Sequence, residues 1–89
     1  MLYTAKCFWP GVVEEDLHLA AARAGCDSSG PVFDGALYLP ADELVLCLFE
    51  AASPAAVKTA SERAGLPCER VIETVWVSPR KKGALRCDG

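Results

Sequence analysis

The sequence predicts an α+β domain in which two β-α-β units share one sheet, and three observations support this prediction. First, the spacing between Cys7 and Arg23-Ala24-Gly25 recurs forty residues later, between Cys47 and Arg63-Ala64-Gly65. Second, each copy joins an apolar, strand-like run to an alanine-rich run that stops at glycine. Third, another apolar run follows each glycine. This repeated order is typical of two successive β-α-β units.

The first unit opens with a strand and a helix. Residues 2–9 predict a strand, because side chains alternate along a strand and the apolar ones fall on the face opposite Thr4 and Lys6. Residues 14–25 predict a helix with an acidic first turn, which the helix dipole favours, and Gly25 is the expected stop. The apolar positions are Tyr3, Ala5, Cys7 and Trp9 on the strand and Leu17, Ala20, Ala21 and Ala24 on the helix.

A hairpin links the two units. Residues 32–39 and 43–50 predict two strands around a turn at 40–42. The second strand is apolar on both faces, and such a strand is normally covered on both sides. Its two faces are formed by Leu44, Leu46 and Leu48 and by Val45, Cys47 and Phe49. Because helices cover only one face of a two-layer domain, we expect a second copy to cover the open face, which makes the protein a homodimer.

The second unit contains the most clearly marked helix. Ser53 is the expected N-cap, Pro54 suits the first helical position, and Gly65 ends the helix. Its buried stripe is formed by Val57, Ala60, Ser61 and Ala64. Residues 71–77 predict the last strand.

The resulting order is β-α-β-β-α-β. With right-handed crossovers, this order predicts a ferredoxin-like sandwich, in which a four-stranded antiparallel sheet carries two helices on one face. We assign residues 1–77 to this domain and residues 78–89 to a basic C-terminal tail.

Charge and cysteine content restrict the partners and the compartment. The net charge is −3, and the basic residues concentrate in the tail, so the acidic body argues against nucleic acid as a partner. No apolar run approaches the ~18 residues of a membrane span, and Met1 leads directly into a strand pattern rather than a signal peptide. The five cysteines contain no C-x-x-C pair, so we expect free thiols and a cytoplasmic location.

Several motifs resemble a known family. They are Phe8–Val12, Leu46–Ala51, Ser53–Val57 and Arg63–Pro67. In their spacing they resemble a family of small bacterial proteins of unknown function, one branch of which is described as nickel-binding or nickel-responsive. The resemblance implies a cytoplasmic, ferredoxin-like dimer with a metal site in some members. Two positions depart from the family pattern: Ala60 stands where members often have histidine, and Lys6 where they tend to have an acidic residue.

Four residues are candidate ligands for nickel or another divalent metal, which accepts imidazole, thiolate and carboxylate ligands. His18 is the single histidine, and Glu14 lies four residues before it on the same helical face. Cys47 occupies the family's cysteine position, and Glu50 matches the family's Glu-Ala step. Each also has an ordinary structural interpretation. Glu14 and His18 can be a solvated charge pair, Cys47 a small buried hydrophobe and Glu50 a strand-end carboxylate.

Two other function classes remain open. No catalytic constellation is evident, because the single histidine offers no Cys-His pair and the glycines form no phosphate cradle, so we do not expect an enzyme. A small-ligand binder, or a cofactor-free oxygenase or isomerase of the dimeric ferredoxin-like barrel type, would use an apolar cavity between sheet and helices. Aromatic residues available to line it are Tyr3, Trp9, Phe33, Tyr38 and Trp76. The last class is a structural dimer without a site.

Overall fold

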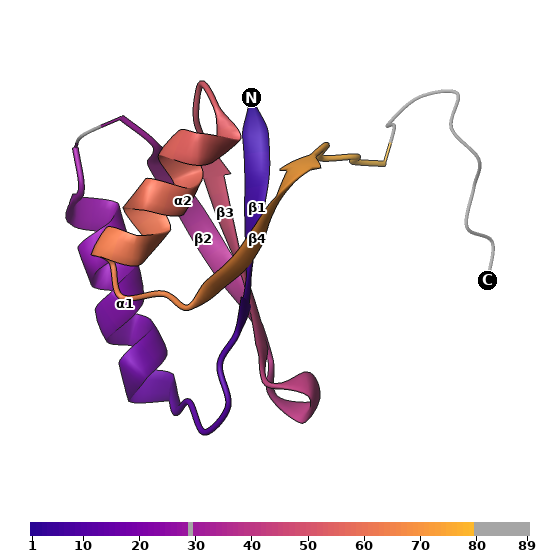
Figure 1. Cartoon of the computed structure of the whole chain (residues 1–89). Helices are drawn as coiled ribbons and strands as arrows, with labels where there is room; N and C mark the ends of the chain where they lie inside the picture. Colours follow the sequence, from indigo (N-terminus) through magenta and orange to yellow (C-terminus); the bar gives the residue numbers. More distant parts are fainter. Residues whose placement is uncertain (29, 80–89) are drawn as a thin grey trace, which may run out of the picture.

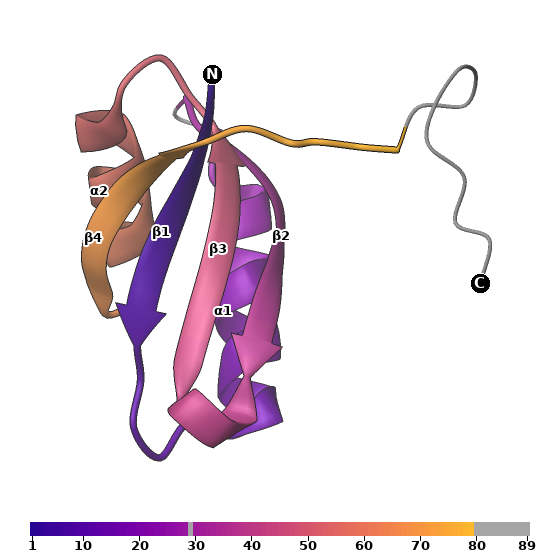
Figure 2. The same ribbon diagram turned by 90° about the vertical axis from the view of Figure 1, so that its right-hand side faces the viewer.

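The predicted ferredoxin-like fold is confirmed. The computed structural model describes residues 1–28 and 30–79, and its strands form one antiparallel sheet in the order β2-β3-β1-β4. Both helices cover the same face, so that the sheet is seen edge-on in Figure 1 and from its helix-free side in Figure 2. The elements are β1 (Leu2–Phe8), α1 (Glu14–Cys26), β2 (Val32–Leu39), the 3-10 turn η1 (Pro40–Asp42), β3 (Leu44–Glu50), α2 (Pro54–Arg63) and β4 (Cys68–Thr74).

Helix α2 begins and ends as the sequence predicts. The Ser53 hydroxyl accepts a hydrogen bond from the Ala56 N–H at 3.3 Å, which satisfies one of the free amides of the first turn. Gly65 adopts a left-handed φ of +81°, its N–H bonds the Glu62 carbonyl, and the Leu66 N–H bonds the Ser61 carbonyl. This pair of bonds is the Schellman arrangement, and it turns buried Leu66 back onto the helix.

Helix α1 differs from the expectation at its C-terminus. It continues through Gly25 to Cys26, and Gly25 is not among the described glycines with positive φ. The helix ends instead where Asp27 becomes extended and its N–H bonds the Ala24 carbonyl at 3.3 Å. Glycine permits a left-handed residue but does not require one, so the stop at Gly25 was wrong.

The last strand lies three residues earlier than predicted. We expected it over 71–77, whereas β4 spans Cys68–Thr74. Cys68 pairs with Cys7, and Thr74 pairs with Leu2, the first residue of β1. Beyond Thr74 there is no neighbouring residue of β1 to pair with, so the apolar run 75–77 leaves the sheet and its side chains are exposed.

The core lies between the sheet and the helices. It contains the predicted inward residues of β1 and β3 and the alanine-rich stripes of both helices. Phe49 is fully enclosed, and its ring packs against Phe33 with centroids 5.3 Å apart and a tilt of 58°. Small side chains on the helices let them lie close to the sheet. The buried core residues include Tyr3, Ala5, Cys7, Ala20, Ala24, Val45, Cys47, Phe49, Val57, Ala60, Ala64 and Leu66.

The opposite face of the sheet is also apolar and has no helix over it. Leu44, Leu46 and Leu48 lie there half-buried, and Phe8 and Leu37 on neighbouring strands are more exposed. After β4 the chain crosses this side of the sheet (Figure 2). Buried and half-buried residues alternate along β3, which confirms the two apolar faces predicted for this strand.

Arg80, Lys81, Lys82 and Arg86, which carry the basic charge predicted for the tail, lie outside the described residues. Neither helix within the described ranges is long and apolar enough to cross a membrane.

Candidate functional site

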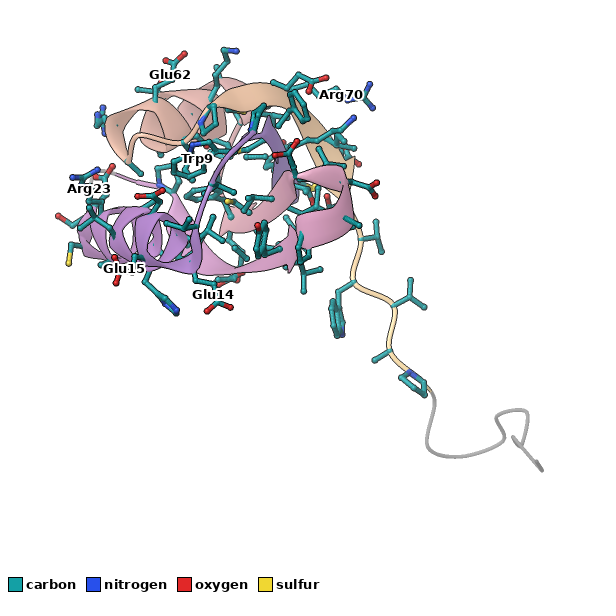
Figure 3. The ribbon with its side chains drawn as sticks, turned by 90° about the horizontal axis from the view of Figure 1, so that it is seen from below. Trp9, Glu14, Glu15, Arg23, Glu62 and Arg70 are labelled. Atoms are coloured by element: carbon teal, nitrogen blue, oxygen red, sulfur yellow. The ribbon has the colours of Figure 1, made fainter. Side chains whose placement is uncertain are left out.

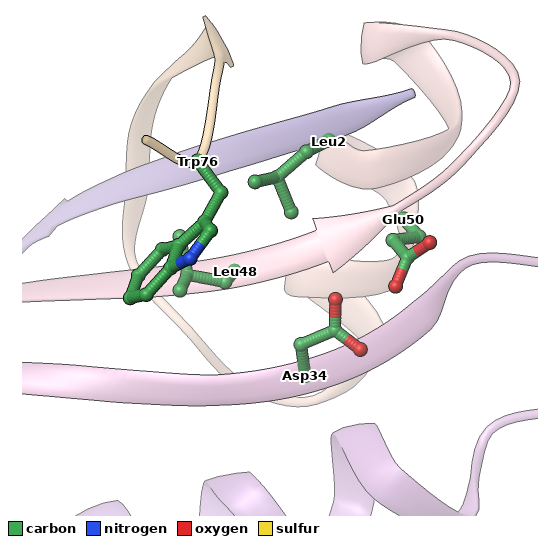
Figure 4. Close-up of a pocket in the computed structure, with 5 residues that line it drawn as sticks. All are labelled: Leu2, Asp34, Leu48, Glu50 and Trp76. Atoms are coloured by element: carbon green, nitrogen blue, oxygen red, sulfur yellow. The ribbon is translucent and has the colours of Figure 1, made fainter. Parts of the chain in front are cut away.

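A pocket of about 460 Å³ lies at one end of the helix-free face. Leu2 of β1 and Leu48 of β3 form its floor, and the Trp76 indole stands over them (Figure 4). Two carboxylates, those of Asp34 and Glu50, complete the lining and point toward one another. The pocket thus combines an apolar floor with one concentrated pair of acidic groups.

Three elements bring these side chains together. Glu50 is the last residue of β3, opposite Leu2 of β1. In β2 the register with β3 shifts between Phe33 and Gly35, so Asp34 is the extra residue of a β-bulge. Gly35 takes a φ of +135°, which favours glycine, and the bulge sets the Asp34 carboxylate beside Glu50.

The two carboxylates influence each other's ionisation. The hydrogen bond that the protonated Glu50 carboxyl donates to Asp34 raises the pKa of Glu50, and the negative charge of Asp34 raises it further, while the amino-terminal charge opposes the shift. Two carboxylates in one place repel each other when both are ionised. The pair therefore favours a shared proton or a bound cation over two bare negative charges.

The structure does not gather the four ligands expected from the sequence. Glu50 lies at the pocket, but Cys47 is on the other face of β3, buried against the helices and 1% exposed. Glu14 and His18 are exposed on α1, which covers the sheet face opposite the pocket (Figure 3 labels Glu14). Within residues 1–28 and 30–79 no three His, Cys, Asp or Glu side chains form a group that could hold a metal ion.

Asp34 is the site residue that sequence reasoning missed. The available signal was an acidic residue before glycine inside an otherwise apolar strand, a combination that indicates a bulge. That signal predicts a local irregularity but not its neighbour. The approach of Asp34 to Glu50 depends on the register between β2 and β3, which cannot be predicted from the sequence alone.

Within residues 1–28 and 30–79, the pocket found between the sheet and the helices is very small, and Phe33 is the one aromatic candidate in its lining. The gap there that Leu17, Phe33 and Cys47 help to line measures about 10 Å³, which is room for one water molecule at most. Of the five aromatic candidates, Trp76 alone lines the larger pocket, which lies on the opposite side of the sheet. The cavity predicted for a barrel-type enzyme therefore has a different location and a different lining.

A cluster of three thiols lies behind the sheet. Cys7 of β1 is the register partner of Cys68 of β4, and Cys47 of β3 is diagonal to Cys7. The Cys7 thiol donates a hydrogen bond to the Ala5 carbonyl at 3.7 Å, and its interaction with Cys47 raises the pKa of Cys7 and lowers that of Cys47. Burial raises the pKa of Cys68. All three thiols are free, as is exposed Cys26 on α1.

Comparison with known proteins agrees with this architecture. The crystal structure of SCO4226 from Streptomyces coelicolor A3(2) matches with a TM-score of 0.75 and 23% identity over 88% of this chain and 100% of that chain. At this identity the likeness shows the fold alone. A search of curated proteins finds no match.

A family described as nickel responsive protein SCO4226-like matches residues 10–74. This range takes in both helices, β2 and β3, and all of β4. The family resemblance inferred from the sequence motifs is thereby confirmed. Since the match covers well over half of the 89 residues, the chain belongs to the SCO4226-like family of nickel responsive proteins.

Proposed function

We propose that this protein is a cytoplasmic, non-catalytic homodimer that binds a divalent metal ion such as nickel at Asp34 and Glu50. The observation that carries the proposal is the pair of adjacent carboxylates at the end of the open sheet face, in a chain of a nickel-responsive family. Glu50 was expected as a ligand from the sequence, and Asp34 extends that expectation.

The donor chemistry fits a divalent cation. The two carboxylates repel each other when both are ionised, and this repulsion helps to raise the pKa of Glu50. A cation bound between them would attract both. Carboxylates are acceptable ligands for nickel, although imidazole suits it better. Two carboxylates leave room for water ligands or for groups from a second copy, and within residues 1–28 and 30–79 no third His, Cys, Asp or Glu side chain completes a group with them.

Glu14 and His18 form a separate, weaker candidate pair. They stand four residues apart on exposed helix α1, which places both on one face. The pair supplies the imidazole that the carboxylate pair lacks. The proposal leaves out Cys47, because its thiol is enclosed on the other side of the sheet.

The dimer interface that we propose is the helix-free face of the sheet. Leu37 is 58% exposed and Phe8 49% exposed there, beside the half-buried leucines of β3. Exposed apolar side chains gathered on one face favour association over contact with water. A second copy offers the same surface, so a two-fold arrangement covers both faces at once.

Nickel binding is tested by titrating the full chain with Ni²⁺ and following tryptophan fluorescence, with native mass spectrometry for stoichiometry. We expect saturable quenching, because Trp76 lines the same pocket as the carboxylates, and Trp76→Phe should remove most of it. The double variant Asp34→Asn/Glu50→Gln should weaken binding at least tenfold, equivalent to about 1.4 kcal/mol. The matched control is His18→Ala, which should bind like the wild type.

The outcomes separate the two candidate pairs. If His18→Ala abolishes binding and the carboxylate variant does not, the site is on α1 and the proposal for Asp34 and Glu50 fails. If no nickel adduct forms with the wild type, metal binding fails altogether.

The dimer is tested by sedimentation velocity over a range of protein concentrations. Leu46→Glu puts a charge in the middle of the open face and should yield monomers with unchanged circular dichroism. Leu19→Glu is the control, since Leu19 is 53% exposed on α1, away from the proposed interface. A wild type that sediments as one chain at every concentration rules out the interface.

The pocket itself supports a second candidate function. Its volume of about 460 Å³ falls within the range of small-molecule sites, roughly 300–1,000 Å³. Its lining is apolar apart from the two carboxylates, which suits a small amphipathic cation. If Trp76 fluorescence responds to hydrophobic amines and not to Ni²⁺, this function replaces metal binding.

A further inference from the structure

The three-thiol cluster behind the sheet has no part in the proposed metal site. It lies on the helix-facing side, where Cys7 of central strand β1 stands between Cys68 of edge strand β4 and Cys47 of β3. The thiols are free, and the sequence repeat that relates Cys7 to Cys47 does not extend to Cys68. Their approach is therefore a product of strand pairing.

Strand register places one pair in the cluster opposite each other. Cys7 and Cys68 face each other directly in the antiparallel ladder. Directly opposite residues have Cα atoms about 4.5–5.5 Å apart, within the roughly 4.4–6.8 Å that a disulfide spans. The β-bulge beside this pair gives the backbone freedom to adjust.

Cys47 is too far for either alternative bridge. It pairs with Ala5, so it is diagonal to Cys7, and diagonal neighbours lie about 7–8 Å apart. Cys47 and Cys68 are separated by the whole of β1, or about twice the 4.7–4.9 Å strand spacing. Both separations exceed the reach of a disulfide.

Access to solvent also differs among the three. Cys7 is 0% exposed and Cys47 is 1% exposed, whereas Cys68 is only partly buried at the sheet edge. A small solute therefore meets Cys68 first, and Cys7 lies directly behind it.

We propose that Cys7 and Cys68 form a redox-active dithiol site, which a hydroperoxide converts into an intrachain disulfide.

The reaction proceeds in two balanced steps. The ionised fraction of Cys68, which its raised pKa keeps small at neutral pH, attacks one oxygen of the hydroperoxide; an S–O bond forms, the O–O bond breaks, and the alcohol or water leaves with the proton that the thiol gave up. The Cys7 sulfur then attacks the sulfur of this sulfenic acid, so that the S–S bond forms and the S–O bond breaks. Water leaves with the Cys7 proton. The two thiols lose two electrons, and the hydroperoxide gains them.

The site is tested on the full, reduced chain with one equivalent of hydrogen peroxide. Remaining thiols are then alkylated, and the protein is digested with trypsin without reduction. Cleavage after lysine and arginine puts Cys7 in peptide 7–23, Cys68 in peptide 64–70, and Cys26 with Cys47 in peptide 24–58. A bridge between Cys7 and Cys68 therefore links peptides 7–23 and 64–70. A bridge from either of them to Cys47 links its peptide to peptide 24–58.

We expect the loss of two alkylatable thiols and a linked peptide of 7–23 with 64–70, which a reductant separates. Cys68→Ser should abolish this product, and Cys26→Ser, the matched change at an exposed cysteine, should leave it unchanged. A bridge to peptide 24–58 in place of this product overturns the proposal. So does oxidation to separate sulfinic acids without any bridge. Because Cys68 is partly exposed, its serine variant is expected to fold, and circular dichroism checks that it does.

Discussion

The two faces of the sheet should respond differently to the same truncation. Phe49 of β3 faces the helices and is 0% exposed, whereas Phe8 of the adjacent strand β1 faces away from them and is 49% exposed. Phe49→Ala and Phe8→Ala remove identical atoms from the two sides. The comparison therefore isolates burial from side-chain chemistry.

The burial of each ring sets the expected magnitude. Truncating a buried phenylalanine to alanine costs about 3–5 kcal/mol. For Phe49 this figure includes about 0.5–1.5 kcal/mol from the tilted contact with Phe33. Full burial of such a side chain is worth about 1.5–3 kcal/mol, so half-exposed Phe8 should contribute about 1 kcal/mol in the single chain.

Urea unfolding followed by far-UV circular dichroism measures both effects. A domain of 89 residues is stable by only about 4–13 kcal/mol, so Phe49→Ala can leave little folded protein. Phe49→Leu keeps most of the volume and preserves a measurable transition. In dilute protein, Phe49 variants should lose more stability than Phe8→Ala. Equal losses, or a larger loss for Phe8→Ala, would refute the assignment of the two faces.

Two further predictions concern glycine and the carboxylate pair. Gly65→Ala should destabilise the protein by about 1–2 kcal/mol, because it forces alanine into a φ of +81°. Gly25→Ala should stabilise it by about 0.5–1 kcal/mol, because Gly25 lies inside helix α1. Thermal melts that rank the two variants the other way would contradict the backbone conformations assigned to the two glycines. The raised pKa of Glu50 means that its contribution to stability is complete below the ordinary carboxyl pKa and is lost as pH rises through the raised value. Glu50→Gln should therefore gain stability over the wild type as the pH rises from the ordinary carboxyl pKa through the raised value. Parallel urea midpoints for wild type and Glu50→Gln across that range would disprove the coupling to Asp34.

Much of the fold followed from local patterns. The alternation in β1 and β3, the alanine stripes and the caps at Ser53 and Gly65 each depend on residues close together in the chain. These local patterns agree with the folded structure because burial and capping depend on the same short segments. The element order then left the ferredoxin-like sandwich as the topology that right-handed crossovers favour.

The candidate site was predicted only in part. Glu50 was identified from its place at a strand end, but its partner Asp34 was not. The other expected ligands lie on different surfaces, because Cys47 points to the opposite face of the strand that ends in Glu50. A period of two assigns faces within a strand, but it does not say which residue of the next strand lies alongside.

The sequence by itself determined the number and order of the elements, the two apolar faces of β3 and the membership of the core. Tertiary structure alone decided where β4 starts, which acid meets Glu50 and which thiol meets Cys7. Hydrophobic periodicity depends only on the order of residues along the chain, so the sequence alone reveals it. Register and bulges arise from hydrogen bonding between distant segments, and a shift of one residue changes every neighbour.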